Sequence, residues 1–214
     1  MHKLAITIGL ILSTLVGHAN GAESPQKGTV VQAGQHILLG ETIPGLHELK
    51  KTDLTLEFWI RPDQATVART RVLLWLFSNK TGSDVAGIGL SSAAGKLQAN
   101  VLGAKLTAIG TLEANKWVHA CLTIDTRKLN KVATLWVNGH RVDRVLVPHR
   151  WPASFFYTRL MSDPWGNKRF FSGEIGSIRL SSQVLYRENF TPQASWEPDD
   201  NTVLLIPGDQ VRLK

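Results

Sequence analysis

Two neighbouring runs of alternating residues stand out in the sequence: Trp117-Val118-His119-Ala120-Cys121-Leu122-Thr123-Ile124-Asp125 and, after a short polar break, Thr134-Leu135-Trp136-Val137-Asn138-Gly139. In the first run every second residue is apolar, and the residues between them have different chemistry. This period of two predicts a strand with two distinct faces. The second run alternates in the same way and ends in Asn-Gly, which accepts positive φ in a tight turn. The pair therefore predicts an antiparallel hairpin, with these residues of its first strand in the core: Val118, Ala120, Leu122 and Ile124.

Short runs of the same kind recur along the chain between glycine and proline turns. Further strands are predicted at 37–39, 54–60, 72–77, 86–90, 97–102, 175–180 and 203–206. The last of these is expected to pair beside the start of the chain. No stretch has a sustained helical period, so the pattern predicts an all-β protein, an antiparallel β-sandwich or jelly roll. The connection 148–170 is long and aromatic; it either serves binding or folds back over the core.

The N-terminus has the pattern of a secretory signal peptide at 1–22. Lys3 precedes an uncharged apolar stretch at 4–16, which is shorter than the roughly 20 residues of a membrane span, and small residues follow it. We expect a polar, loosely attached leader at 23–34 and one domain at 35–214. The protein should be secreted or periplasmic, and not membrane-spanning. The single cysteine, Cys121, sits within a strand pattern and is expected to be a buried residue rather than a reactive thiol.

The formal charge is +7, and loss of Lys3 with the signal peptide leaves +6. Residues 139–190 hold eight lysines and arginines against four aspartates and glutamates. This excess favours an anionic partner, such as an acidic polysaccharide or a membrane surface, although a solvated basic surface without a specific partner has the same composition. Nucleic acid is not expected, because the cations are scattered and no nucleic-acid motif is present.

Four local patterns resemble the laminin G-like, concanavalin A-like lectin/glucanase family (LamG-like jelly roll), and they occur in the family's order. They are Leu54-Thr55-Leu56-Glu57-Phe58-Trp59-Ile60-Arg61-Pro62, the run 117–125, Leu135-Trp136-Val137-Asn138-Gly139, and Phe171-Ser172-Gly173-Glu174-Ile175-Gly176-Ser177-Ile178-Arg179-Leu180-Ser181. The resemblance spans about residues 35–206 and implies a concanavalin A-like jelly roll.

The chain departs from that family in its acidic residues. Gly176 and Ser177 replace an acidic pair of the last pattern, and no residues match the calcium-ligating carboxylates of some members. Asp84 and Asp163 are the weak candidates for calcium, with loop carbonyls as further ligands. We expect no cofactor.

Catalytic patterns are missing from the sequence. The enzyme branches of the resembled family use paired carboxylates along one strand, typically Glu-x-Asp-x-x-Glu, and no such triple occurs. The histidines beyond the signal peptide lack zinc-ligand spacing, and there is no Gly-x-Ser-x-Gly elbow. The protein is therefore expected not to be an enzyme; a divergent glycoside hydrolase is the less favoured alternative.

The residues expected to bind a ligand are mostly aromatic. If each strand keeps its alternation, one face gathers Trp59, Trp117, His119, Trp136 and Arg179, and the connection 148–170 adds Trp151 and Trp165. Indole faces stack on sugar rings, and an arginine fork engages a carboxylate or sulfate. The competing interpretation is that the connection covers this face and that His119 is buried and hydrogen-bonded across the sheet. The sequence predicts a secreted, non-catalytic module that binds carbohydrate or a cell-surface glycan; the alternative is a protein-interaction or structural domain of an envelope assembly.

Overall fold

The computed structural model describes residues 25, 28–35, 37–38, 53–77, 87–108, 110, 112–126, 130–147, 157–161 and 169–211. The predicted signal peptide, Asp84, Trp151, Asp163 and Trp165 lie outside these residues. No helix among the described residues is long and apolar enough to cross a membrane.

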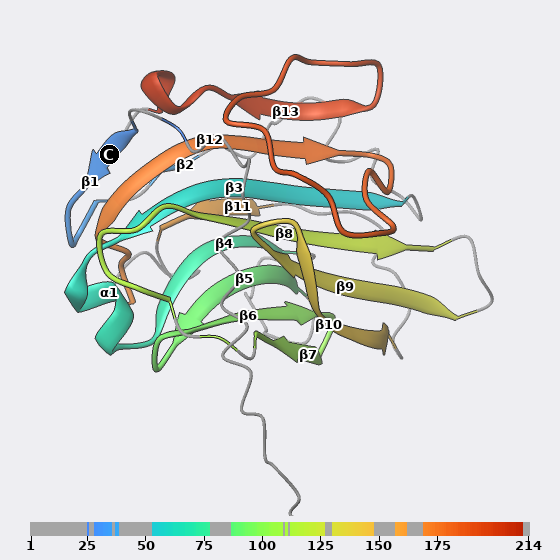
Figure 1. Cartoon of the computed structure of the whole chain (residues 1–214), viewed down its shortest axis with the longest axis horizontal. Coiled ribbons are helices and arrows are strands. Elements are labelled where there is room, and N and C mark those ends of the chain that lie inside the picture. The colour runs from blue at the N-terminus through green and yellow to red at the C-terminus, as the bar shows by residue number, and fades with distance from the viewer. Residues whose placement is uncertain are drawn as a thin grey trace, which may run out of the picture.

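Two antiparallel sheets form two layers (Figure 1). Sheet A has the order β1-β12-β3-β8-β9-β10, with β13 also paired to β12. Its strands are β1 (Thr29–Val31), β3 (Leu54–Pro62), β8 (Val118–Asp125), β9 (Lys131–Val137), β10 (His140–Val147), β12 (Gly173–Ser181) and β13 (Thr202–Ile206). Sheet B has the order β2-β11-β4-β5-β6-β7. Its strands are β2 (Ile37–Leu38), β4 (Arg71–Phe77), β5 (Gly87–Ala93), β6 (Lys96–Val101), β7 (Ala104–Thr107) and β11 (Tyr157–Leu160). Helix α1 (Gln64–Ala68) follows β3, and a 3-10 turn at Gly208–Gln210 follows β13.

The hydrophobic core lies between the sheets and takes the inward-facing residues of both. Phe58 of β3, Leu90 of β5 and Ile178 of β12 are each fully buried in it. The four core residues predicted for the first strand of the hairpin are also buried. Alternation along each strand thus leaves sheet A with a second, outward face of different composition. The prediction of an antiparallel β-sandwich jelly roll is confirmed.

The predicted hairpin is β8 paired with β9, with Ala120 opposite Val137 and Leu122 opposite Leu135. Asn138 and Gly139 then turn the chain into β10 with φ of 50° and 77°. A side chain at Gly139 would also collide with the carbonyl oxygen of Phe190. Glycine is therefore required here both by the turn and by the close approach of a distant segment.

Several elements differ from the sequence predictions. Residues 29–31, expected within a loose leader, form β1 and pair with β12. Strand β13 pairs with β12 and not with the start of the chain. It follows β1 along the same edge of β12, since β3 occupies the opposite edge, and Gly208 O in the turn after β13 accepts a hydrogen bond from the Thr29 hydroxyl (2.6 Å). The short strands β7 and β11 and the single turn of α1 lack enough residues to show a period. Strand β10 was also missed, because it is an edge strand whose charged residues hide its alternation.

Candidate functional site

The outward face of sheet A carries most of the predicted ligand-binding residues. Trp59 is paired with His119 across β3 and β8, Arg179 with Glu57 across β12 and β3, and Trp136 with Cys121 across β9 and β8. The prediction that Trp59, His119, Trp136 and Arg179 share a face is therefore confirmed. Yet the exposed fractions of Trp59, His119 and Trp136 are 2%, 0% and 1%. These side chains face outward from the sheet but not toward solvent.

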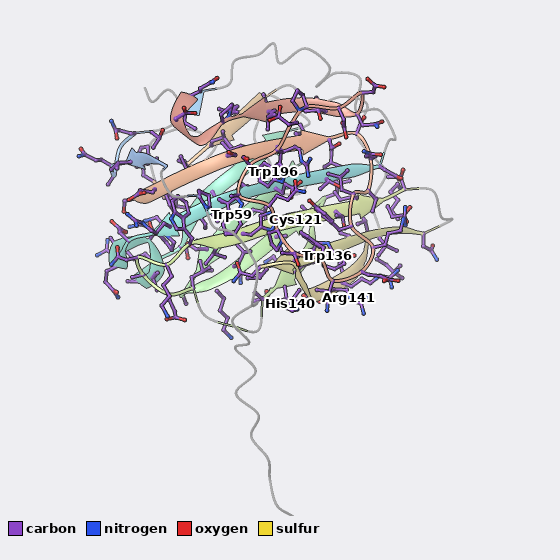
Figure 2. The ribbon with its side chains drawn as sticks, turned by 45° about the horizontal axis from the view of Figure 1, so that its top comes forward. Trp59, Cys121, Trp136, His140, Arg141 and Trp196 are labelled. Atoms are coloured by element: carbon purple, nitrogen blue, oxygen red, sulfur yellow. The ribbon has the colours of Figure 1, made fainter. Side chains whose placement is uncertain are left out.

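Residues 182–201, which we call the C-terminal strap, cover this face. The strap joins β12 to β13 and crosses in front of the sheet (Figure 1). Trp59 Nε1 donates to Gln193 O at 2.8 Å, and the Phe190 ring meets His119 and Trp136 edge-on at 5.7 and 5.8 Å between centroids. Figure 2 shows Trp59, Cys121 and Trp136 along the sheet with Trp196 of the strap beside them. Among the described residues the cover is thus the strap. The competing interpretation named the connection 148–170, most of which lies outside the described residues.

Beneath the strap lies a buried charge network centred on Glu57. Its carboxylate accepts from Arg179 Nε at 2.7 Å and from the Tyr186 hydroxyl at 3.1 Å, and lies 3.0 Å from His119 Nε2. Arg179 also donates to the Tyr186 oxygen at 3.0 Å. Paired, hydrogen-bonded charge is the form in which a carboxylate tolerates full burial. His119, a ligand-binding candidate from the sequence, is thus buried and hydrogen-bonded across the sheet, as the competing interpretation had it.

Burial also sets the protonation of two neutral groups in this network. Desolvation, and secondly the Glu57 carboxylate, raise the pKa of the Tyr186 hydroxyl well above its usual range. The same two causes raise the pKa of the Cys121 thiol. Tyr186 therefore keeps the proton that it donates to Glu57, and Cys121 stays a buried thiol, as expected from the sequence.

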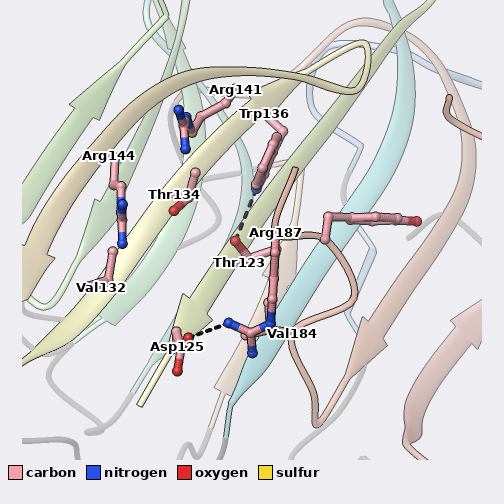
Figure 3. Close-up of a pocket in the computed structure, with 10 residues that line it drawn as sticks. Thr123, Asp125, Val132, Thr134, Trp136, Arg141, Arg144, Val184 and Arg187 are labelled. Atoms are coloured by element: carbon pink, nitrogen blue, oxygen red, sulfur yellow. Dashed lines mark hydrogen bonds and ion pairs between the residues drawn. The ribbon is translucent and has the colours of Figure 1, made fainter. Parts of the chain in front are cut away.

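The strap leaves one end of the face open, and a pocket of about 230 Å³ lies there (Figure 3). We call it the arginine pocket. It is lined by Thr123 and Asp125 of β8, Val132, Thr134 and Trp136 of β9, Arg141 and Arg144 of β10, and Val184, Tyr186 and Arg187 of the strap. The pocket therefore has a sheet floor and one wall made by the strap.

A β-bulge aims two arginines into the pocket. In a regular strand, residues three apart face opposite sides of the sheet. Here the register shifts between Arg141 and Asp143, so that Arg141 lies opposite Trp136 and Arg144 opposite Thr134. Trp136 and Thr134 are two apart and share the outward face. The extra residue, Val142, thus puts both arginines on that face, a re-aiming that bulges often provide near binding sites.

Some polar groups of the pocket are paired with one another and others are not. Arg187 Nη1 contacts Asp125 Oδ2 at 2.6 Å, and Trp136 Nε1 donates to Thr123 Oγ1 at 3.0 Å. The guanidinium groups of Arg141 and Arg144, in contrast, have no hydrogen-bond or ion-pair partner among the described residues. Two donor-rich cations therefore remain available to a ligand.

The structure places the predicted site residues in different parts of the sheet face. Of the candidates that the structure describes, only Trp136 lines the arginine pocket. Trp117 lies half-buried at the far end of the face, with the Arg61 guanidinium 5.7 Å from its ring centroid. Sequence reasoning did not select the three pocket arginines as site residues. The excess of positive charge in residues 139–190 includes these arginines, but it does not indicate that they line one pocket.

A metal site needs several ligand side chains close together. No group of three or more His, Cys, Asp or Glu side chains is arranged for a metal ion in the part of the chain that the structure describes. Both calcium candidates, Asp84 and Asp163, lie outside it. The two calcium candidates and the expectation that no cofactor is needed stay predictions.

Solved structures with the same fold include carbohydrate-binding proteins. A Bacteroides ovatus protein to which carbohydrate binding is ascribed matches with 15% identity and a TM-score of 0.60 over 84% of this chain, and the chain spans half the length of that protein. The CBM40 module of the Ruminococcus gnavus IT-sialidase, bound to α2,3 sialyllactose, matches with 16% identity and a TM-score of 0.60, over 75% of this chain and 92% of the module. A heptameric SAP-like pentraxin from Limulus polyphemus has 12% identity and a TM-score of 0.50, over 90% of this chain and 92% of the pentraxin.

At such low identity these likenesses show the fold alone. No curated protein sequence matches the chain at a significant level. The family model of the concanavalin A-like lectin/glucanases superfamily matches residues 34–189, which include the hairpin, its bulged third strand and β12. On that match and on its two-sheet architecture, the chain belongs to the concanavalin A-like lectin/glucanases superfamily.

Proposed function

We propose that the protein is a non-catalytic, exported module that binds a glycan, and that the arginine pocket is its ligand site. The observation that carries the proposal is the contrast within one sheet face. The aromatic part is sealed by the strap, while the pocket at its end offers two guanidinium groups that no described residue pairs with, above a floor with threonine hydroxyls.

The size of the pocket indicates what portion of a glycan it could hold. Its volume of about 230 Å³ is below the range of about 300–1,000 Å³ that encloses a drug-sized ligand. We therefore expect it to take one sugar ring or one ring substituent, with the remainder of the chain outside. The carbohydrate-binding proteins that share this fold support such a role, but they place no site on this chain.

The acidic residues support binding without catalysis. Asp125 is the one carboxylate among the described residues that line the pocket, and Arg187 is bound to it. Glycoside hydrolysis of the usual kind needs two carboxyl groups across one cleft. Glu57 does not supply the second, because it is fully buried in its own network under the strap.

A glycan array with neutral and acidic polysaccharides tests the proposal. The purified protein should bind a subset of glycans, and the double variant R141Q/R144Q should lose that binding while remaining folded. Arg69, an exposed residue after α1, provides the control variant R69Q with a change of the same kind elsewhere. Failure of the wild-type protein to bind any glycan would sink the proposal, and unchanged binding by R141Q/R144Q would move the site away from the pocket.

A further inference from the structure

The geometry of the arginine pocket points to an acidic glycan: we infer that Arg141 and Arg144 together bind a carboxylate or sulfate on the sugar. This inference rests on the proposed function and narrows it to a ligand class. It makes these two arginines the specificity-determining residues of the site.

The charge of the pocket is the first argument. The described residues of its lining include three arginines and one aspartate, which leaves two positive charges. Arg187 and Asp125 offset each other at 2.6 Å, so the charges without a partner among the described residues are those of Arg141 and Arg144. A neutral sugar would not neutralise either charge, whereas one oxyanion can accept hydrogen bonds from both arginines.

The register of β10 is the second argument. Without the bulge at Val142, Arg141 and Arg144 would face opposite sides of the sheet. With it, they flank one stretch of β9, opposite Trp136 and Thr134. Figure 3 shows both arginines extending from β10 toward Thr134, while Arg187 reaches Asp125 from the other side. Both arginines therefore lie on the same face of the sheet and line the same pocket.

The surroundings of the two arginines are the third argument. Asp143 is the acidic residue nearest to them in sequence, and both of its carboxylate oxygens bind backbone N–H groups. Oδ2 accepts from Thr107 N at 2.8 Å, and Oδ1 accepts from Arg144 N at 2.7 Å. The backbone of Arg141 is fixed as well, because its N–H donates to Asn189 Oδ1 of the strap at 3.0 Å. The arginine backbones are thus held in place, and the acid that would otherwise neutralise them is engaged elsewhere.

Calorimetric titration with matched oligosaccharides tests the inference. One ligand carries a terminal uronic acid, the second is the same oligosaccharide with that carboxylate reduced to the alcohol, and the third carries a sulfate on the same ring. We expect the uronate or the sulfate, or both, to bind at least about tenfold more tightly than the neutral analogue, which is the scale of one charge-assisted hydrogen bond. The stronger of the two acidic ligands identifies the oxyanion.

Variants locate the effect. R141Q and R144Q should each lower affinity for the acidic ligand about tenfold, and by clearly more than they lower affinity for the neutral analogue, whereas R69Q should change neither. Affinity for the acidic ligand should also fall as salt concentration rises. Equal affinity for acidic and neutral ligands would overturn the inference while leaving glycan binding intact. Binding of no glycan at all would instead remove the proposed function itself.

Discussion

The two ends of one sheet face have opposite characters. Under the strap, aromatic rings and the Glu57 network are packed away from solvent, with Trp59 and His119 at 2% and 0% exposure. At the β10 end, the same face opens into a pocket with cations that have no partner among the described residues. The residues most suggestive of sugar binding are thus structural, and the residues available to a ligand are arginines that no motif marks.

The comparison teaches that the role of a face depends on what covers it. Trp59, Trp136 and His119 form the surface on which Phe190 and Gln193 of the strap dock. Removing groups from the covered end should therefore cost stability and affect binding only through it. Removing groups from the open end should weaken binding and leave the free energy of unfolding nearly unchanged.

The largest effect is expected for E57A. Loss of this fully buried carboxylate leaves the mostly buried Arg179 charge without its partner, which costs on the order of 3–5 kcal/mol in buried pairs. The open-end control R144A should lower the free energy of unfolding by no more than about 0.5 kcal/mol, as is usual for surface changes. Urea denaturation measures both. Similar stabilities for the two variants would break the distinction between the ends.

A smaller effect is expected for W59F. Phenylalanine keeps most of the ring but loses the indole N–H that donates to Gln193 O at 2.8 Å. The expected cost is about 0.5–1.5 kcal/mol, the net contribution of one hydrogen bond, because Gln193 is an exposed residue whose carbonyl can bond to water instead. Limited proteolysis should then cleave the strap faster in W59F than in the wild type. If cleavage rates were equal, the bond would not hold the strap.

The reactivity of Cys121 reports on the same cover without any mutation. Its thiol is fully buried, and its pKa is raised mainly by that burial. A thiol reagent at neutral pH should modify the native protein far more slowly than the unfolded protein. Rapid reaction of the native protein would show that the face is open in solution.

The smallest effect concerns the end of the strap. A hydrogen bond from the Thr202 hydroxyl, with further ones from the backbone of Asn201 and Thr202, lowers the pKa of Asp199. Because the folded value is depressed, this stabilisation is present above the unfolded pKa of about 3.9 and is lost as pH falls through the folded value. D199N should therefore be less stable than the wild type at pH 7, and the difference should vanish in acid. A difference that persists in acid would assign the effect to something other than this charge.

The sequence predicted the fold well because period and turn chemistry are local. Alternation in β3, β8 and β9 was enough to place both the core and the shared face of Trp59 and His119. The strap could not be predicted, since its contacts join residues far apart, such as Trp59 with Gln193, and its own sequence has no period. The pocket was not predicted for a different reason. Strict alternation puts Arg141 and Arg144 on opposite faces, and nothing local marks Val142 as the bulge.

Native-state hydrogen exchange of the strap tests the central claim most directly. The amides of Leu185 and Phe190 donate to Thr55 Oγ1 and Gly139 O at 3.0 Å each, so opening of the strap must break these bonds. If the strap seals the tryptophan face, these amides should exchange as slowly as those of β3 and β8, through global unfolding. Exchange of these two amides orders of magnitude faster than that of the sheet would contradict the account, because the face would then open to ligands in the native state.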